Sequence, residues 1–306
     1  PVNDPPSITS SAVTAVDEDA SYSYTLTADD IDGDELVYAA PTKPDWLSFN
    51  STTRILSGTP DYLKVGSHSV VLTVTESGGA AIQTSQVFTI NVNAVNDAPV
   101  ISSSAVTNAT EDVAYSYAIT ASDEDGDVLT YAAPTLPDWL EFNTSTHVLS
   151  SAIGQPDNTN VGDHTVVLTV TDNGEGTLQD TQTFTITVTN TNDAPVLDPI
   201  SDPSAVLEDG NSLVVTVSPT DVDTEASLTV TVTTNNSSLF SASTITVSPE
   251  TGASNVPRTI TLDPVDNQNG TALVTVNVTD GTESVYQQFT VTVTPVNDAP
   301  ILTSIE

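Results

Sequence analysis

A short Asn-Asp motif that precedes proline occurs four times and divides the chain into three segments of similar length. The strings VNDPP, VNDAP, TNDAP and VNDAP begin at Val2, Val95, Thr191 and Val296. Their asparagines are separated by 93, 96 and 105 residues, a period that suits a seven-stranded β-sandwich of about 100 residues. The spacing predicts three tandem domains, joined by short NDxP linkers, over residues 1–95, 96–191 and 192–306.

Segments 1–95 and 96–191 are near copies of each other. The string SYSYTLTADDIDGDELVYAAPTKPDWLSFN from Ser21 parallels AYSYAITASDEDGDVLTYAAPTLPDWLEFN from Ala114. Apolar residues alternate in the strand-like runs, as in Val70, Leu72 and Val74, which is the period of a strand with one buried face. Turn residues separate these runs, and no window has helical periodicity. The pattern predicts an all-β chain of antiparallel sandwiches.

The third segment shares only its ends with the other two. It keeps LEDG from Leu207 and FTVTVTPVNDAP from Phe289, but it lacks the PDWLxFN string. We expect a sandwich of a related but different subtype.

Acidic residues dominate the charge of the chain, with 41 Asp and Glu against 4 Lys and Arg and a formal net charge of −37. No basic surface exists to meet phosphates, so nucleic acid is excluded as a partner, and docking on anionic lipid is disfavoured. Two compatible explanations remain. The carboxylates either keep the surface solvated or bind hard metal ions.

The chain contains no cysteine and no methionine. Disulfides are therefore impossible, and cations bound by oxygen ligands are the expected staples between small extracellular domains. The missing methionine indicates a fragment of a longer protein. Because no apolar stretch is long enough to cross a bilayer, we expect no membrane insertion in this fragment, and we expect a monomer.

The acids recur at four places in each segment. These are a Glu-Asp pair after the linker, a D-x-D turn, an acid that closes an alternating strand, and the linker itself. Asp and Asn are common in solvated turns, which is the simpler explanation for any single turn. So many uncompensated carboxylates at one junction would repel each other, however, which favours a bound cation.

This four-part pattern resembles the cadherin superfamily, and the first two segments are similar to the dystroglycan-type cadherin-like (bacterial Ig-like) repeats of large bacterial surface adhesins. The resemblance implies Ig/cadherin-like Greek-key sandwiches with Ca²⁺ bound where one domain meets the next. The LDRE segment of animal cadherins has no clear counterpart, although Asp61 and Asp157 lie near its place.

The resemblance also implies ligands, residue by residue. At the junction around Asn96 (junction 1) they would be Glu18, Asn96, Asp97, Asp123, Asp125 and Asp172. At the junction around Asn192 (junction 2) they would be Glu111, Asn192, Asp193, Asp221, Asp223 and Asp280. Two half-sites would remain at the ends, one with Asn3, Asp4, Asp30, Asp32 and Glu76, the other with Glu208, Asn297 and Asp298.

The expected function is that of a calcium-rigidified extender or stalk in a secreted bacterial surface adhesin. Its partners would be the neighbouring domains of the same chain. Carbohydrate binding or calcium-dependent cell–cell adhesion is the alternative, with surface glycans or another cell as partner. Trp46 and Trp139 could stack on a sugar, although packing in the core is the expectation.

No feature of the sequence predicts an enzyme. His68, His147 and His164 lack zinc-ligand spacing, and structural roles are expected for them. The acids lie in polar turns rather than in an apolar pocket that would raise the pKa of a catalytic acid.

Overall fold

The computed structural model describes residues 2–78, 81–223 and 227–298. Their contacts form two compact units, Pro1–Thr107 with Ser116–Ser151 and His164–Ile186, and Asn108–Tyr115 with Ala152–Asp163 and Thr187–Glu306. Strands make up nearly all regular structure of the described residues, so the all-β prediction is confirmed. The two helical turns are short 3-10 segments, and no described helix could span a membrane. The domain boundaries at 95/96 and 191/192 remain a prediction.

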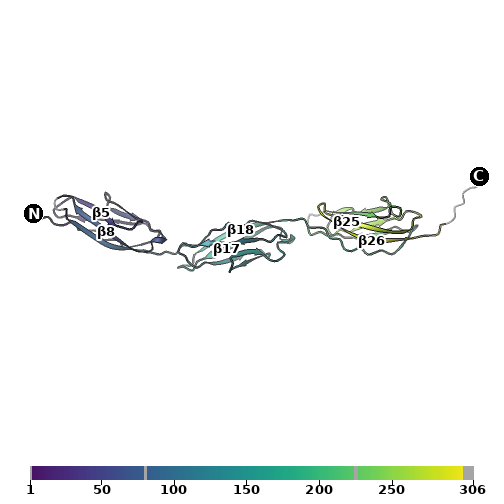
Figure 1. Ribbon diagram of the computed structural model, residues 1–306, viewed down its shortest axis with the longest axis horizontal. Coiled ribbons are helices and arrows are strands. Elements are labelled where there is room, and N and C mark those ends of the chain that lie inside the picture. Colours follow the sequence, from purple (N-terminus) through teal and green to yellow (C-terminus); the bar gives the residue numbers. More distant parts are fainter. Residues whose placement is uncertain (1, 79–80, 224–226, 299–306) are drawn as a thin grey trace, which may run out of the picture. The chain divides into compact units, whose positions relative to one another are not determined.

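The first sandwich contains two facing sheets, of order β2-β9-β8-β5 and β3-β7-β6, and the pair β1-β4. Figure 1 shows β5 and β8 side by side, and they pair antiparallel. Its elements are β1 (Ser7–Ile8), β2 (Ala15–Asp17), β3 (Tyr22–Thr25), β4 (Ala28–Asp29), β5 (Leu36–Thr42), β6 (Leu47–Asn50), β7 (Ile55–Gly58), η1 (Tyr62–Lys64), β8 (Gly66–Glu76) and β9 (Gln83–Asn93).

Alternation along the strands explains why these two sheets stack. Val70, Leu72 and Val74 on β8 are fully buried, and Tyr22 and Tyr24 on β3 meet them from the other sheet. Burial of apolar area contributes about 25 cal/mol per Å², so a sheet with one apolar face gains stability by covering that face. The predicted sandwich is confirmed.

The second sandwich repeats this arrangement, with sheets β11-β18-β17-β14 and β12-β16-β15 and the pair β10-β13. Its elements are β10 (Val100–Ile101), β11 (Asn108–Thr110), β12 (Ser116–Ala118), β13 (Ala121–Ser122), β14 (Thr130–Thr135), β15 (Leu140–Asn143), β16 (Val148–Ser151), η2 (Asn158–Asn160), β17 (Gly162–Thr171) and β18 (Gln179–Thr189).

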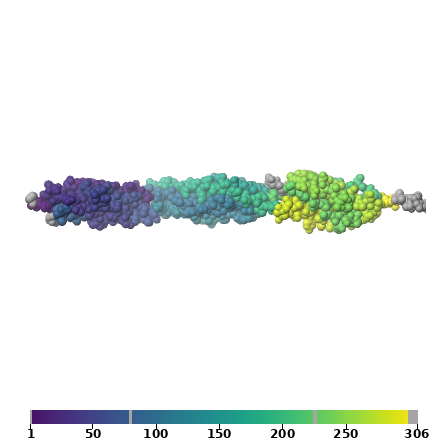
Figure 2. All heavy atoms as spheres, turned by 90° about the horizontal axis from the view of Figure 1, so that it is seen from above, coloured from purple at the N-terminus to yellow at the C-terminus, as the bar shows by residue number. Residues whose placement is uncertain are grey.

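The third sandwich has a five-stranded sheet, β19-β26-β25-β21-β23, and a three-stranded sheet, β20-β24-β22. Figure 2 shows its yellow C-terminal residues packed against the green residues of the preceding strands. Its elements are β19 (Val206–Leu207), β20 (Leu213–Val217), β21 (Ser227–Thr234), β22 (Ile245–Ser248), β23 (Thr251–Ala253), β24 (Arg258–Leu262), β25 (Gly270–Thr279) and β26 (Ser284–Thr294). The additional strand β23 confirms the expected difference in subtype.

The core of the third sandwich contains a buried cation. Phe240 and Phe289 lie in its apolar cluster, and the side chain of Arg258 is completely buried. The Arg258 guanidinium donates to the backbone carbonyls of Val256, Ala253 (3.2 Å) and Leu228 (3.4 Å). Arg258, on β24 of the three-stranded sheet, therefore binds β21 and β23 of the five-stranded sheet through hydrogen bonds rather than through an ion pair.

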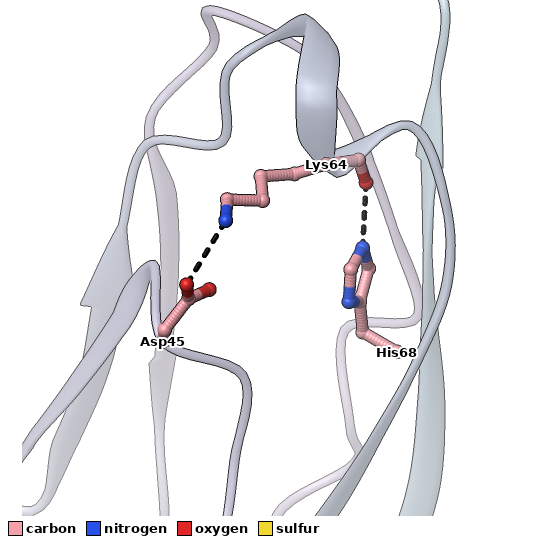
Figure 3. A network of polar contacts seen from close by, with 3 residues as sticks. All are labelled: Asp45, Lys64 and His68. Atoms are coloured by element: carbon pink, nitrogen blue, oxygen red, sulfur yellow. Dashed lines mark hydrogen bonds and ion pairs between the residues drawn. The ribbon is translucent and has the colours of Figure 1, made fainter.

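The tryptophans and histidines have structural roles, as expected. Trp139 is only 2% exposed, and Trp46 packs on the first core with its ring edge-on to Tyr22 (5.9 Å) and His68 (5.8 Å). His68 also contacts the carbonyl oxygen of Lys64, whose ammonium pairs with Asp45 at 2.9 Å (Figure 3). These contacts hold η1 against the sandwich; Trp139 is buried, and Trp46 is partly buried.

A parallel strand pair places each linker beside the start of its own domain. Strand β2 pairs parallel with β9, β11 with β18, and β19 with β26. The residue after β2, β11 and β19 is the Glu of a Glu-Asp pair, and its N–H donates to the last strand: Glu18 to Asn93 (3.0 Å), Glu111 to Thr189 (2.9 Å) and Glu208 to Thr294 (3.1 Å). The following linker must therefore leave the domain next to this glutamate.

Candidate metal centres

A buried glutamate binds the linker of each sandwich. The backbone N–H that precedes the linker asparagine donates to one oxygen of the glutamate: Val95 to Glu18 (2.6 Å), Thr191 to Glu111 (3.1 Å) and Val296 to Glu208 (2.9 Å). The three glutamates are 3%, 1% and 5% exposed. Such burial is costly for a carboxylate unless its oxygens find donors or a cation.

The D-x-D turn fixes the linker aspartate from the other side. The aspartate N–H donates to the second Asp of the turn: Asp4 to Asp32 (2.8 Å), Asp97 to Asp125 (2.7 Å) and Asp193 to Asp223 (2.8 Å). Within the turns, the N–H groups of Asp32, Asp125 and Asp223 donate to the first Asp, at 2.9, 3.1 and 2.9 Å. Alternate aspartates therefore hold the turn and the linker at once.

The linker asparagine contacts the strand-end acid. Its amide donates to a carboxylate oxygen in each case: Asn3 to Glu76 (2.8 Å), Asn96 to Asp172 (3.0 Å) and Asn192 to Asp280 (3.0 Å). The acids are themselves oriented by backbone N–H groups, such as those of Gly174 and Leu178 on Asp172, and those of Thr282 and Glu283 on Asp280. The structure thus links the predicted positions of both junctions to a linker directly or, for Asp123 and Asp221, through the second Asp of the turn.

At junction 1 the carboxylate oxygens of Glu18, Asp97 and Asp125 lie within 4.8 Å of one another. All three residues belong to the first unit. Among the described residues, Glu18 Oε2, Asp97 Oδ2 and Asp123 Oδ2 are buried and have no hydrogen-bond partner. Burial, and then the charges of Asp125, Asp19 and Asp123, raise the pKa of Asp97. These orphaned oxygens fit a hard cation such as Ca²⁺, which takes six to eight oxygen ligands.

At junction 2 the group within 4.8 Å contains Glu111, Asp112 and Asp193. Burial is the main cause that raises the pKa of Glu111 and of Asp193, and neighbouring carboxylates add to it. The group borders a pocket of about 360 Å³ that Asp157, Asn158, Thr159 and Val222 also line. Asp223, predicted as a ligand here, accepts hydrogen bonds from two amide side chains, while Asp221 keeps one buried oxygen without a partner among the described residues.

The two end sites differ in completeness. The C-terminal one brings together Glu208, Asp209 and Asp298 within 4.8 Å, while the amide of Asn297 donates to the Asp298 carbonyl at 3.4 Å. The N-terminal one has the contacts of Asn3, Asp4 and Asp32 described above, with buried oxygens of Asp30 and Glu76 unpartnered among the described residues.

Sequence reasoning did not assign Asp112, Asp209 and Asp127 as site residues. The first two are the second residues of the Glu-Asp pairs, so the signal was present in the repeat. Asp127 closes the D-x-D-G-D string, and burial with the charges of Asp123, Asp172 and Asp125 raises its pKa. A Cβ on Gly174 would lie 1.7 Å from Asn96 Oδ1 and 2.2 Å from Asp127 Oδ2, so only glycine leaves room for both oxygens.

No curated protein matches the chain. Among solved structures, the protocadherin GammaB4 extracellular domain is similar with a TM-score of 0.54 and 18% identity, over 95% of this chain and 51% of that one. The chain therefore spans about half the length of that structure. Mouse cadherin-23 EC22-24 gives a TM-score of 0.50 and 16% identity, over 96% and 100% of the two chains. At such identities these matches establish a cadherin-like tandem fold.

The sequence family is established independently of the solved structures. Residues 5–93 and 98–189 each match the family described as "Putative Ig domain". These two matches cover more than half of the chain and coincide with its two similar repeats. The chain belongs to this Ig-domain family, with two family repeats followed by a third, cadherin-like sandwich.

Proposed function

We propose that the chain is a calcium-rigidified extender of a secreted bacterial cell-surface adhesin. Calcium bound at each junction would fix the orientation of neighbouring sandwiches. The proposal rests above all on Glu18, a 3% exposed carboxylate beside Asp97 and Asp125 whose second oxygen is buried without a partner among the described residues.

The residues of junction 1 suit such a role because Glu18, Asp125 and Asp172 also contact the linker. Glu18 comes from the preceding sandwich, Asp97 from the linker and Asp125 from the following turn, with Asn96 joined to Asp172. Like charges at this separation disfavour one another without a counter-charge. A bound calcium ion would neutralise them and make the linker a single rigid connection. Glu111, Asp112 and Asp193 supply the corresponding acids at junction 2.

An extracellular location agrees with this chemistry. Extracellular calcium modules bind the ion with dissociation constants of about 10⁻⁴ to 10⁻³ M, which is the range needed to stay loaded outside a cell. The neighbouring domains of the same long chain would be the immediate partners. The carbohydrate-binding alternative loses its main support, because Trp139 is buried and Trp46 packs on the first core.

Replacement of Glu18 by Gln tests the proposal. With a dissociation constant of about 10⁻⁴ M, 10 mM calcium would stabilise junction 1 by about 2.7 kcal/mol. We expect Glu18→Gln to weaken the first-junction affinity by about tenfold or more while the protein stays folded. Calorimetric titration with CaCl₂ and small-angle scattering with and without chelator are the measurements.

Glu141→Gln is the matched control, because it removes the same charge from an exposed position on β15. It should leave both the affinity and the scattering unchanged. Identical calcium titrations for the wild type and Glu18→Gln would disprove the assignment of Glu18. If the scattering curve and the melting temperature are the same in calcium and in chelator, the rigidification proposal is wrong.

A further inference from the structure

The second aspartate of the D-x-D turn, Asp125 at junction 1 and Asp223 at junction 2, has different hydrogen-bond partners at the two junctions. Asp223 is only 8% exposed, and three N–H groups donate to it. The backbone of Asp193 donates to Oδ2 at 2.8 Å, while the side-chain amides of Asn158 and Asn190 donate to Oδ1 at 3.1 and 2.7 Å. Hydrogen bonds to an ionised carboxylate are stronger than neutral ones, so Asp223 is compensated without a cation.

Both amides belong to the second sandwich, whereas Asp223 lies in the first acidic turn of the third. Asn158 opens the helical turn η2, which Asp157 caps by accepting the N–H of Thr159 at 3.0 Å. Asn190 directly follows β18. All of these residues lie in the second unit. The two amides therefore connect the same elements that a metal ion at junction 2 would connect.

The corresponding positions of junction 1 do not make this connection. In the repeat, Asn158 corresponds to Tyr62 and Asn190 to Ala94. Alanine has no donor, and among the described residues the Tyr62 hydroxyl makes no hydrogen bond to Asp125, which accepts the Asp97 N–H. Asp125 is exposed, receives the Asp97 N–H, and lies within 4.8 Å of two other carboxylate oxygens. Without a cation, repulsion between these groups disfavours the contact between turn and linker.

We propose that Asn158, Asn190 and Asp223 form a cation-independent amide latch that holds junction 2 together when calcium is absent. The inference rests on the proposed function, since it describes how the junctions share their dependence on calcium. Junction 1 is the calcium-sensitive hinge of the chain. Junction 2 binds calcium at Glu111, Asp112 and Asp193, yet it keeps its turn attached to the second sandwich after the ion leaves.

Because the chain contains no cysteine, spin labels can be placed at single introduced cysteines. Ser23 on β3, Ser116 on β12 and Thr216 on β20 are exposed positions, one in each sandwich. Pulsed dipolar spectroscopy on the Ser23–Ser116 pair reports on junction 1, and the Ser116–Thr216 pair reports on junction 2. Each distance distribution is recorded in calcium and in chelator. Thermal unfolding in calcium checks that every variant is folded.

In the wild type, we expect chelator to broaden the junction 1 distribution at least twofold more than that of junction 2. In the double variant Asn158→Tyr, Asn190→Ala, the distance distribution across junction 2 should broaden in chelator and become narrow again in calcium. In the reciprocal variant Tyr62→Asn, Ala94→Asn, the distance distribution across junction 1 in chelator should be narrower than in the wild type.

Equal broadening of both junctions in the wild type would overturn the latch while leaving the calcium proposal intact. So would a double variant that keeps junction 2 narrow in chelator. If neither distance distribution responds to chelator, the proposed function is wrong. The latch is then wrong as well, because the two junctions would not differ in their response to calcium.

Discussion

The first and third sandwiches have different interiors and the same ends. The core of the first sandwich contains Tyr22 and Tyr24, with Trp46 packed against it. The core of the third contains Phe240, Phe289 and the buried Arg258, and its larger sheet has the additional strand β23. At both linkers, however, an asparagine amide binds the strand-end acid and an aspartate N–H binds the turn. Packing requirements do not explain acids that keep their places while the core changes. The ends are therefore constrained by something other than the interior.

The arginines show the same contrast. Arg54 of the first segment is exposed, with its guanidinium 5.4 Å from the centre of the Tyr38 ring. Arg258 of the third is fully buried on backbone carbonyls. In a chain with four basic residues, neither arginine forms an ion pair among the described residues. The two arginines are therefore not the counter-charge of the junctions.

The largest effect is expected for Arg258→Ala. The substitution leaves a cavity in the core and buried carbonyl groups without a donor. Together these should lower the unfolding free energy of the third sandwich by about 4 kcal/mol. Arg54→Ala is the control and should cost no more than about 1 kcal/mol. Chemical denaturation followed by tyrosine fluorescence measures both. Equal losses would remove the contrast between the two arginines.

A smaller loss is expected for Trp46→Ala, because this indole is only partly buried. We expect about 2–3 kcal/mol, below the 3–5 kcal/mol typical of a fully buried tryptophan. The calcium-induced rise in melting temperature should stay unchanged, since the ring contacts of the indole are with Tyr22 and His68 rather than with a junction acid. Differential scanning calorimetry with and without calcium tests this. If the Trp46→Ala variant shows no calcium-induced rise in melting temperature, calcium binding at the junction depends on the packing of the first core.

The smallest effect concerns pH without calcium. Burial, with neighbouring carboxylates, raises the pKa of Asp97, Glu111, Asp193 and Asp221. The folded state therefore binds more protons than the unfolded state just above the ordinary carboxyl range, and its stability rises as pH falls from about 7 to about 5. The lowered pKa values of Asp157 and Asp280 stabilise the fold at higher pH and lose that effect only in stronger acid.

With calcium bound, this dependence should reverse, because protons compete with the metal for the same oxygens. Melting curves at several pH values, in chelator and in calcium, separate the two cases. The same pH dependence in both would show that the acids with raised pKa are not ligands.

Much of the architecture could be predicted from the sequence. Alternation such as Val70, Leu72 and Val74 reports directly on burial, and the NDxP spacing reports on domain length, so the sandwiches and their number followed. The difference of the third sandwich was also visible, because it lacks the PDWLxFN string. Strand β23 and the burial of Arg258 were not predictable, since an isolated arginine in a Thr-rich stretch carries no periodic signal.

The candidate sites were predictable in their outline and not in their detail. The carboxylates of Glu18, Asp97 and Asp125 come together as the motif implied. The place of Asp112 beside Glu111 depends on a backbone that turns at Asp112, with φ of 58°. The amides of Asn158 and Asn190 are distant in sequence from Asp223, and no repeat links them, because the first segment has Tyr62 and Ala94 instead.

The parallel pairing of β2, β11 and β19 with the last strands of their sandwiches has a mechanical consequence. The chain enters each sandwich before one of these strands and leaves after the other, so tension along the chain pulls the two in opposite directions along their length. The hydrogen bonds between them then carry the load together in shear rather than opening one by one. The pairs β2–β9 and β11–β18 each contain three residue pairs, whereas β19–β26 contains two. Under a pulling force, the third sandwich has the shortest of these shear contacts.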